Sequence, residues 1–327
     1  MTQILMHVDH LSERGSTTAL YEYANCLSQL GHEISIFYQK NSPYTNLMAL
    51  SEMSKSFYTH GYSDFYELNN KIKGQFEYAY FLKGGENDGK LIDGAKNYIH
   101  SMFQFWEPHG DSYAYVSAWL ADSMREKLEL VNRKNKIKLI GNAKFNFVPH
   151  IVDMPKTFQN IRKKIGVPEN AICGVRIGGK DSFDIPWVHW AIEYMAKEYG
   201  FYFIFVNTNK FSNHKNIIYL ETITDKQYKA DLISSADFFI HGRSRGESFG
   251  ISIIEALQLS IPVLAWSGGI DKNHTVLLDS NYLYRDCYDL IRKMRDIEFK
   301  NLQKVEGGIE FRPKYVMTKF LEIFPIL

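Results

Sequence analysis

Short apolar runs alternate with longer amphipathic stretches along the chain, which is the pattern of an α/β protein. At the N-terminus, residues 4–8 form an apolar run, residues 17–30 place apolar side chains on one helical face, and residues 32–38 form a second run. Ser16 is expected to cap the start of this helix and Gly31 its end. The order strand, helix, strand predicts a parallel, doubly wound sheet.

The same alternation continues to the C-terminus. Residues 41–75 are polar and irregular, so we expect only short helices and loops there. Strands are expected at 78–82, 98–103, 113–117, 172–177, 201–206, 217–220, 237–240 and 262–266. Helices are expected at 118–130, 185–199, 225–234, 251–259, 271–279, 286–294 and 315–324, with Asp181 to Asp184 capping the helix that begins near residue 185. The sequence thus predicts two similar α/β halves.

Composition narrows the classes of function. The chain has 327 residues, of which 45% are hydrophobic and 23% charged, the balance of a soluble globular protein with about two domains. A net charge of +1 gives no support for nucleic-acid binding. Cys26, Cys173 and Cys287 are too far apart for a metal pair and odd in number, so we expect reduced thiols in a cytoplasmic protein.

Nothing in the chain resembles a membrane-targeting segment. The first ten residues lack the basic and apolar regions of a signal peptide, and no apolar run is long enough to span a bilayer. The basic residues 162–164 form the end of a solvated helix or a weak surface contact. Contact with a membrane is therefore expected to be at most peripheral.

The stretch 241–268 carries the strongest candidate chemistry. It contains a polar loop after a strand, a helix that begins after Gly250, and the next strand. A helix N-terminus presents free N–H groups and a partial positive charge, which suits a phosphate. Gly246 and Gly250 allow the backbone to approach a ligand closely, and Arg243 and Arg245 add positive charge.

Two glutamates flank this turn. Glu247 lies in the loop, and Glu255 lies about two turns into the helix. Carboxylates accept hydrogen bonds from paired hydroxyls such as those of a ribose or a hexose. A phosphate-binding backbone between two such carboxylates fits a sugar nucleotide. The alternative explanation is a chance pair of glutamates on a solvated helix face.

This segment resembles the paired-glutamate motif of retaining GT-B glycosyltransferases, in the large group (group 1, family 4-like) that transfers hexoses from nucleotide sugars. The family pattern E-G-F-G-x-x-x-x-E-A, followed by P-V, is matched by ESFG at 247–250, EA at 255–256 and PV at 262–263. The resemblance implies that Glu247 contacts the donor sugar and Glu255 the ribose. The diphosphate would be held by Arg243 and by backbone N–H groups at Phe249, Gly250, Ile251 and Ser252.

Looser matches extend the resemblance over nearly the whole chain. The family has a glycine-rich loop near the donor phosphates and the acceptor, of which Gly15 remains here. It also has two diphosphate-binding cations five positions apart, where this chain has Arg176 and Lys180 four apart, with Gly178 between them. The family seats the nucleotide base at a loop that corresponds to the one containing Thr222.

The resemblance also implies a histidine that touches the donor sugar. Family members often carry it upstream of a valine-serine turn, which residues 116–117 match here. His100 and His109 are both candidates, and one sequence does not choose between them. The segment 148–153 resembles the end of the first domain of the family.

The sequence therefore predicts the GT-B fold, with two Rossmann-like, doubly wound α/β domains and an active site in the cleft between them. The expected bounds are 1–153 for an acceptor domain, 154–170 for a linker and 171–310 for a nucleotide-sugar domain. The resemblance implies that a final helix, residues 311–327, packs back on the first domain.

The expected reaction moves a hexose from a nucleotide diphosphate sugar to a hydroxyl of a carbohydrate or another acceptor, with retention at the anomeric carbon. We expect no cofactor and no metal, since the chain lacks the Asp-x-Asp triplet of the other major glycosyltransferase fold. Two alternatives are a nucleotide-sugar epimerase on the same fold and a non-catalytic protein that binds nucleotide sugars or glycans. The base, the hexose and the acceptor are not assigned.

Overall fold

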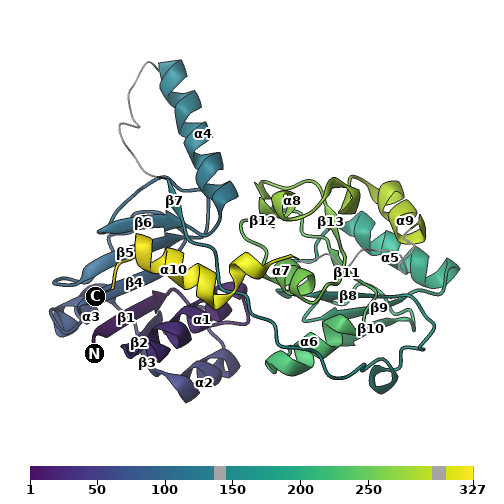
Figure 1. The fold of residues 1–327 in the computed structure, drawn as a ribbon, viewed down its shortest axis with the longest axis horizontal. Coiled ribbons are helices and arrows are strands. Elements are labelled where there is room, and N and C mark those ends of the chain that lie inside the picture. The colour runs from purple at the N-terminus through teal and green to yellow at the C-terminus, as the bar shows by residue number, and fades with distance from the viewer. Residues whose placement is uncertain (136–144, 297–306, 327) are drawn as a thin grey trace. The chain divides into compact units, whose positions relative to one another are not determined.

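The computed structural model describes residues 1–135, 145–296 and 307–326. The chain separates into two compact units, coloured along the chain in Figure 1. Unit 1 comprises Met1–Ile151 and Pro313–Leu327, and unit 2 comprises Val152–Arg312. Each unit contains its own parallel sheet flanked by helices. No helix within the described ranges has the length and apolar character needed to cross a membrane.

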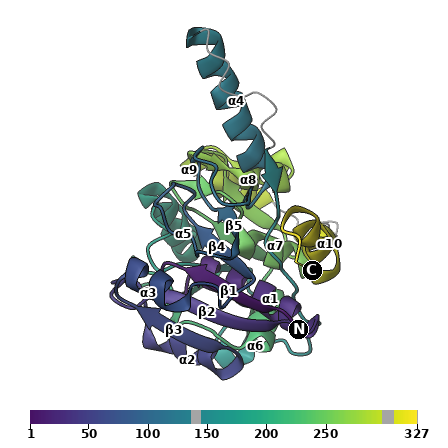
Figure 2. The same cartoon turned by 90° about the vertical axis from the view of Figure 1, so that its left-hand side faces the viewer.

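Unit 1 is built on a seven-stranded parallel sheet with the order β3-β2-β1-β4-β5-β6-β7. The strands are β1 (Gln3–Val8), β2 (Glu33–Gln39), β3 (Tyr58–Tyr62), β4 (Tyr78–Lys83), β5 (Lys96–Ser101), β6 (Ser112–Tyr115) and β7 (Asn146–Phe147). Figure 2 shows β1, β2 and β3 side by side. The chain leaves β1 toward β2 and later returns to β4 on the other side, which makes β1 and β4 a topological switch point.

The helices of unit 1 are α1 (Gly15–Gln29), α2 (Leu47–Ser56), α3 (Phe65–Ile72), α4 (Ala118–Asn135) and α10 (Pro313–Ile323). The start of α1 differs from the expectation, because Arg14 occupies the N-cap position without a side-chain hydrogen bond and Ser16 lies inside the helix. The side chain of Thr17 instead accepts a hydrogen bond from the N–H of Ser12 in the preceding loop.

The segment 41–75 contains a strand that the sequence pattern did not indicate. Between α2 and α3, strand β3 pairs along its length with β2 at the edge of the sheet. Its residues are partly polar, and only Tyr62 is buried. An edge strand pairs with a neighbouring strand on one side only, so it needs no continuous apolar run. The expectation of short helices and loops alone was therefore wrong for 58–62.

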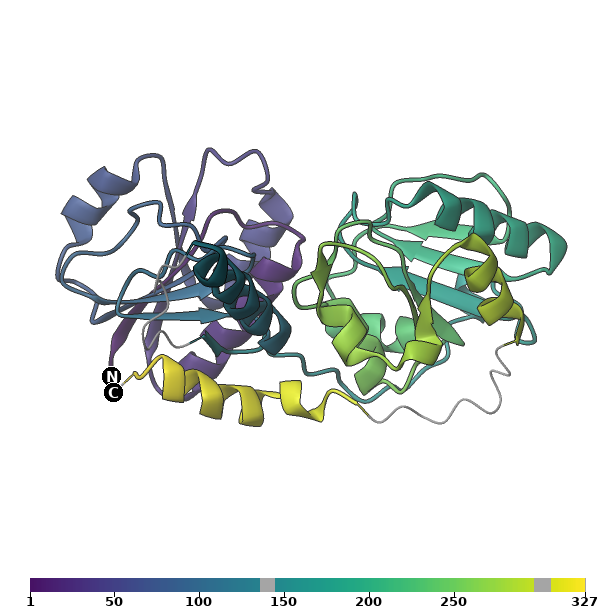
Figure 3. The same ribbon diagram turned by 90° about the horizontal axis from the view of Figure 1, so that it is seen from above.

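Helix α10 lies against unit 1, as Figure 3 shows in yellow. Its Phe320 ring contacts Tyr23 of α1 at a centroid distance of 5.0 Å, and Phe324, just beyond the helix, stacks on Tyr98 at 5.5 Å. The hydroxyl of Ser112 donates a hydrogen bond to the Ile323 carbonyl at 2.8 Å. The last part of the chain is thereby tied to the same core as the first.

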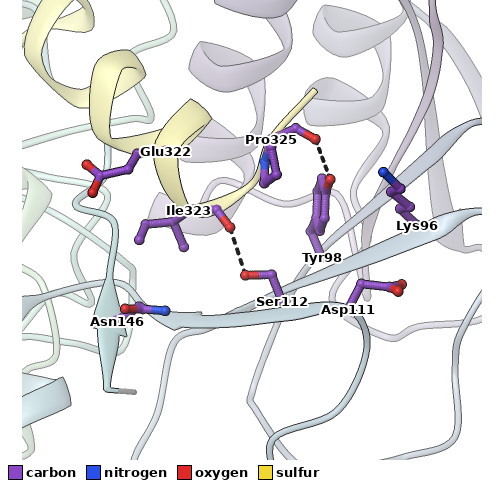
Figure 4. Close-up of a pocket in the computed structure, with 8 residues that line it drawn as sticks. All are labelled: Lys96, Tyr98, Asp111, Ser112, Asn146, Glu322, Ile323 and Pro325. Carbon is purple, nitrogen blue, oxygen red and sulfur yellow. Dashed lines mark hydrogen bonds between the residues drawn. The ribbon is translucent and has the colours of Figure 1, made fainter. Parts of the chain in front are cut away.

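A hollow of about 490 Å³ lies beside the end of α10 (Figure 4). Lys96 and Ser112 line it at the amino ends of β5 and β6, and Tyr98 donates a hydrogen bond across it to the Pro325 carbonyl. Open parallel sheets bind ligands at the carboxyl ends of their strands. This hollow lies at the opposite edge and is therefore not the candidate site.

Unit 2 contains a six-stranded parallel sheet with the order β10-β9-β8-β11-β13-β15. The strands are β8 (Cys173–Ile177), β9 (Tyr202–Val206), β10 (Ile217–Leu220), β11 (Phe238–His241), β13 (Val263–Trp266) and β15 (Leu283–Tyr284), and a small separate pair joins β12 (Gly246–Glu247) to β14 (Asp271–Lys272). The switch point of this sheet lies between β8 and β11.

The helices of unit 2 are α5 (Pro186–Glu198), α6 (Lys226–Ser234), α7 (Ile251–Gln258), α8 (Asn273–Leu277) and α9 (Cys287–Asp296). Asp225 caps α6 by accepting the N–H of Tyr228. The expected capping of α5 was wrong, because Ile185 occupies the cap position and Asp184 accepts the N–H of Ser244 at 2.7 Å. Asp184 thus ties the loop before α5 to the loop after β11.

Candidate functional site

The switch point of unit 2 brings together two loops that the sequence singled out. One loop follows β8 and contains Gly178 and Lys180, and the other follows β11 and contains Arg243 and Glu247. Because β8 and β11 are neighbours and parallel, their carboxyl ends lie at the same edge of the sheet. This edge is where doubly wound sheets place ligands.

One position in the loop after β11 requires glycine, because the backbone of another segment passes too close to leave room for a side chain. Gly246 has φ of +78°, and a Cβ atom there would lie 2.0 Å from the carbonyl oxygen of Asp271. The approach arises because β12 pairs with β14, and Arg245 reinforces it with an ion pair to Asp271 at 2.8 Å. These contacts hold the backbone of the loop at residues 245–247, from which Glu247 projects.

Glu247 is held by two side chains of its own loop and strand. Its carboxylate accepts hydrogen bonds from Nε2 of His241 at 2.9 Å and from Nη1 of Arg243 at 3.2 Å. Burial alone would raise the pKa of Glu247, but the hydrogen bond from His241 and the charge of Arg243 lower the pKa below its usual range. The side chain is 18% exposed, so an ionised carboxylate reaches the surface of the site.

Two histidines support this arrangement, and sequence reasoning missed both. Since a carboxylate only accepts, Nε2 of His241 carries the proton, and its buried Nδ1 has no hydrogen-bond partner. His274 lies at a ring-centroid distance of 5.6 Å and donates from Nε2 to the Trp266 carbonyl at 2.8 Å. Burial lowers the pKa of His274 to about 4. The position of His241 at the end of a buried strand was the available signal.

Helix α7 begins at this edge without a capping side chain. Gly250 occupies the N-cap position with φ of +96°, and as a glycine it has no side chain with which to cap the first turn. By helix geometry, the N–H groups of Ile251 and Ser252 have no acceptor within the helix. Phe249 is 4% exposed and packs on Phe311 at 5.5 Å, so its side chain anchors the loop while the backbone reaches the helix start.

Glu255 occupies a different environment from Glu247. It lies on the buried side of α7 and is 5% exposed, and its carboxylate forms an ion pair with Lys229 of α6. No contact within the described part of the chain joins Glu255 to Glu247. The two glutamates therefore lie on one loop-helix segment, with the second carboxylate paired inside the fold.

Arg176 is a structural cation in this geometry. It is 3% exposed, and its terminal nitrogens donate to the Asn207 carbonyl at 3.1 Å and to Ser182 at 2.7 Å, among other oxygens of the chain. A Cβ at Gly178 would lie 2.7 Å from this guanidinium, so the glycine leaves room for it. Burial lowers the pKa of Arg176 to about 10, although the negative charge of Glu247 acts to raise it. These bonds occupy the groups with which Arg176 was expected to bind a diphosphate.

The remaining residues expected in unit 2 lie in loops. Lys180 follows β8 and is exposed. Thr222 lies in the loop after β10 and is half-buried. Both loops leave the carboxyl edge of the sheet, as expected from the strand order.

His100 and His109 have different surroundings in unit 1. His100 has no exposed surface, donates from Nε2 to the Val148 carbonyl at 2.8 Å, and accepts from the Tyr80 hydroxyl at 2.6 Å. It is therefore a core residue, which corrects the expectation that it touches a sugar. His109 donates from Nδ1 to the Glu107 carbonyl at 2.6 Å, and its Nε2 has no hydrogen-bond partner.

Gly15 is the first residue of α1, which follows the switch-point strand β1. As in α7, the residue at the N-cap position makes no side-chain hydrogen bond to the helix. Within the residues described, no group of three or more carboxylates, histidines and cysteines could hold a metal ion.

Comparison with known proteins identifies the fold. No family model matches the sequence, and neither does any curated protein. A solved glycosyltransferase from Rickettsia africae is similar over 98% of this chain and 97% of its own, with 16% identity and a TM-score of 0.69. HepE from Anabaena, in complex with UDP-glucose, is similar over 99% and 98%, with 11% identity and a TM-score of 0.71.

A third similar structure is sucrose-phosphate synthase from Thermosynechococcus elongatus, over 98% of this chain and 96% of that one, with 12% identity and a TM-score of 0.65. At these identities the likeness is one of fold. The chain has the GT-B fold, with two Rossmann-like doubly wound units, and the expected fold class is confirmed.

Proposed function

We propose that the protein is a glycosyltransferase that moves a hexose from a nucleotide diphosphate sugar to an acceptor hydroxyl. The observation that carries this proposal is the position of Glu247. An ionised carboxylate, held by His241 and Arg243, stands beside the uncapped start of α7 at the switch point of a doubly wound sheet. The GT-B fold of the similar glycosyltransferases supports it.

Each residue at this edge has a proposed role. Glu247 accepts hydrogen bonds from hydroxyls of the donor sugar, and the free N–H groups at the start of α7 bind the diphosphate together with Lys180 and Arg243. These groups stabilise the negative charge that grows on the leaving diphosphate. Arg176 positions the loop after β8 and contributes its charge without contact.

The nucleoside would lie further along unit 2. Glu255 is proposed to hold the ribose, sharing its carboxylate with Lys229, and Thr222 lies in the loop proposed to seat the base. Retention at the anomeric carbon and a reaction without a metal are part of the proposal and rest on the paired-glutamate motif. HepE was solved with UDP-glucose, which makes this compound the first donor to test.

The experiment is a donor screen on the purified full chain. We expect UDP or another nucleoside diphosphate, and the matching sugar nucleotide, to raise the unfolding temperature, since a ligand that binds only the folded state stabilises it by mass action. Slow hydrolysis of the same donor, and transfer to an added sugar, should accompany the shift. Absence of a shift with every nucleoside diphosphate and sugar nucleotide would contradict the proposal.

A non-catalytic sugar-nucleotide-binding protein is the second candidate, and the buried bonds of Arg176 favour it over an epimerase. Binding of a donor with neither hydrolysis nor transfer would support this candidate. Conversion of the donor to its epimer without an acceptor would support an epimerase.

A further inference from the structure

A hollow of about 350 Å³ lies at one edge of unit 2, away from the loop after β11. The end of β13, the strand β15, the short helix η2 (Ser280–Tyr282) and α9 contribute to its lining. β15 is the outermost strand on this side of the sheet, two strands away from β11. The polar side chains that line the hollow are those of Ser267, Ser280, Arg285, Asp289, Arg292 and Lys293. None of them belongs to the proposed donor site.

Three cations share one carboxylate in this hollow. Asp289 is 7% exposed, and its carboxylate accepts hydrogen bonds from Nη2 of Arg292 at 2.6 Å and from the backbone N–H of Arg285 at 3.1 Å. Nε of Arg285 lies 3.5 Å from the same carboxylate. Burial alone would raise the pKa of Asp289, but these hydrogen bonds and the charge of Lys293 lower it. An ionised Asp289 therefore offsets one of three positive charges.

The other charges near the hollow do not remove this excess. Nζ of Lys293 donates to the Asn281 carbonyl at 2.6 Å, and a carbonyl orients an ammonium group without neutralising it. Asp279 and Asp286 lie close along the chain, but neither lines the hollow. Their carboxylates accept the backbone N–H groups of Asn281 and Asp289, each at 2.8 Å. The lining thus carries three cations and one carboxylate.

A solvated group of ion pairs around α9 is the alternative explanation. Arg285 and Arg292 lie four and three positions from Asp289, which are the spacings of ordinary helical pairs. Such pairing needs one cation for each carboxylate, and exposed pairs add little stability. It accounts for neither the second arginine on a single buried carboxylate nor the position of Lys293 beside them. A bound anion would account for all three cations.

The lining groups indicate the class of anion. Guanidinium, ammonium and hydroxyl groups are the side-chain donors with which proteins bind phosphate, and an arginine contacts two phosphate oxygens at once. A phosphate dianion matches the two charges that Asp289 leaves unbalanced, whereas a carboxylate matches one. The volume lies within the range of small-molecule sites, and Leu283 adds an apolar wall.

We propose that the hollow beside β15 binds a phosphate dianion, either free or as the monoester of a small organic molecule. Arg285, Arg292 and Lys293 contact the phosphate oxygens, and the hydroxyls of Ser267 and Ser280 donate to the same ligand. This proposal does not rest on the proposed glycosyl transfer, because no residue of the donor site takes part in it.

The test follows arginine side chains by NMR in the full chain labelled with nitrogen-15 arginine, at about pH 7.5, where a phosphate monoester is a dianion. The Nε–H signal of Arg285 reports on the hollow and that of Arg243 on the proposed donor site, each identified by its loss in the Arg→Gln variant. The probes are glycerol 3-phosphate, inorganic phosphate and acetate, added at constant ionic strength.

We expect glycerol 3-phosphate to shift the Arg285 signal to saturation and to bind at least about tenfold more tightly than acetate, because a dianion gains about twice the Coulomb energy. Tighter binding of glycerol 3-phosphate than of inorganic phosphate would assign the site to an organic monoester, and equal binding would assign it to free phosphate. No saturating shift with either phosphate, or equally tight binding of acetate, would overturn the proposal.

Two variants of α9 locate the binding. Lys293→Gln removes one lining charge but keeps a donor for the Asn281 carbonyl, and it should weaken glycerol 3-phosphate about tenfold. Arg295→Gln is the matched control, because this guanidinium lies over the Tyr199 ring at 5.1 Å and does not line the hollow, so binding should be unchanged. Thermal unfolding of both variants checks the fold.

Unchanged binding in Lys293→Gln, or equal weakening in both variants, would refute the site. Because Arg243 and Arg285 give separate signals, a failure of the proposed donor site and a failure of this site remain distinguishable in one sample.

Discussion

The two units share a doubly wound parallel sheet, yet the loops at their switch points differ in charge. In unit 2, three cations, Arg176, Lys180 and Arg243, accompany Glu247 beside an uncapped helix start. In unit 1, Lys83 and Lys90 form ion pairs with Asp88 and Asp9, and the Glu107 carboxylate accepts a hydrogen bond from Asn87 of the same loop. The sheet decides where a ligand binds, and the side chains at that edge decide its charge. The edge of unit 2, where Lys180 and Arg243 accompany the start of α7, suits a diphosphate.

The largest effect that tests this contrast is expected from Glu247→Ala. Removing a carboxylate that contacts the donor sugar should lower the rate of transfer by about 10²- to 10³-fold, the range seen when one preorganised polar group is lost from an active site. The measurement is kcat with the donor found in the screen. Glu198→Gln, an exposed glutamate at the end of α5, is the control and should keep full activity. Unchanged kcat in Glu247→Ala would contradict the placement of the donor site at Glu247 in unit 2.

The second-largest effect is expected at low pH, which should destabilise unit 1 more than unit 2. In unit 1, burial lowers the pKa of His7 and of His100 to about 4 and that of His150 well below its usual value, whereas unit 2 has His274 at about 4. These histidines stay neutral when folded and protonate near pH 6.5 when unfolded. Their stabilising contribution is therefore complete above pH 6.5 and is lost as the pH falls toward 4.

At pH 5.5 each such histidine lowers the free energy of unfolding by about 1.4 kcal/mol relative to pH 7.5. Unit 1 has three of these histidines and unit 2 has one, so unit 1 should lose roughly 3 kcal/mol more. Methionine oxidation along a urea gradient reports on each unit separately, through the buried Met6 of unit 1 and Met195 of unit 2. The Met6 midpoint should fall further than the Met195 midpoint. Equal falls would show that the buried histidines do not set the acid response.

The smallest effect concerns the start of α7. Gly250 and Gly31 both have positive φ, +96° and +92°, with space for a methyl group. Replacement by alanine should cost about 1 kcal/mol of stability at either position, because only backbone strain is added. Gly250→Ala should also weaken diphosphate binding, while Gly31→Ala, in unit 1, should not. Thermal unfolding and nucleotide titration measure the two effects, and equal donor affinity in both variants would argue against phosphate binding at α7.

The local pattern of the chain was sufficient for most elements. The runs at 4–8 and 238–240 and the helical periods at 17–30 and 225–234 correspond to β1, β11, α1 and α6. Periodicity is a property of neighbouring residues, so it can be read without tertiary structure. The polar loops after these strands were also correctly placed at one edge, because parallel strands end together.

The exposure of cations at strand ends could not be read in this way. Arg176 is buried because Asn207 and Thr208, about thirty positions away, turn their oxygens toward it. Lys83 is buried because Ser101 and Tyr113 hold the following loop over the sheet edge. A cation after a strand looks the same in sequence whether it binds a ligand or the protein itself.

By itself, then, the amino-acid sequence determined the α/β alternation, the strand ends that carry polar loops and the glutamate pair near α7. Only the tertiary structure decided that His100 belongs to the core, that Arg176 serves its own loop, and that residues 58–62 form an edge strand. The physical reason is that burial and hydrogen-bond partners are set by groups distant along the chain, whereas helix and strand periods are set by adjacent ones.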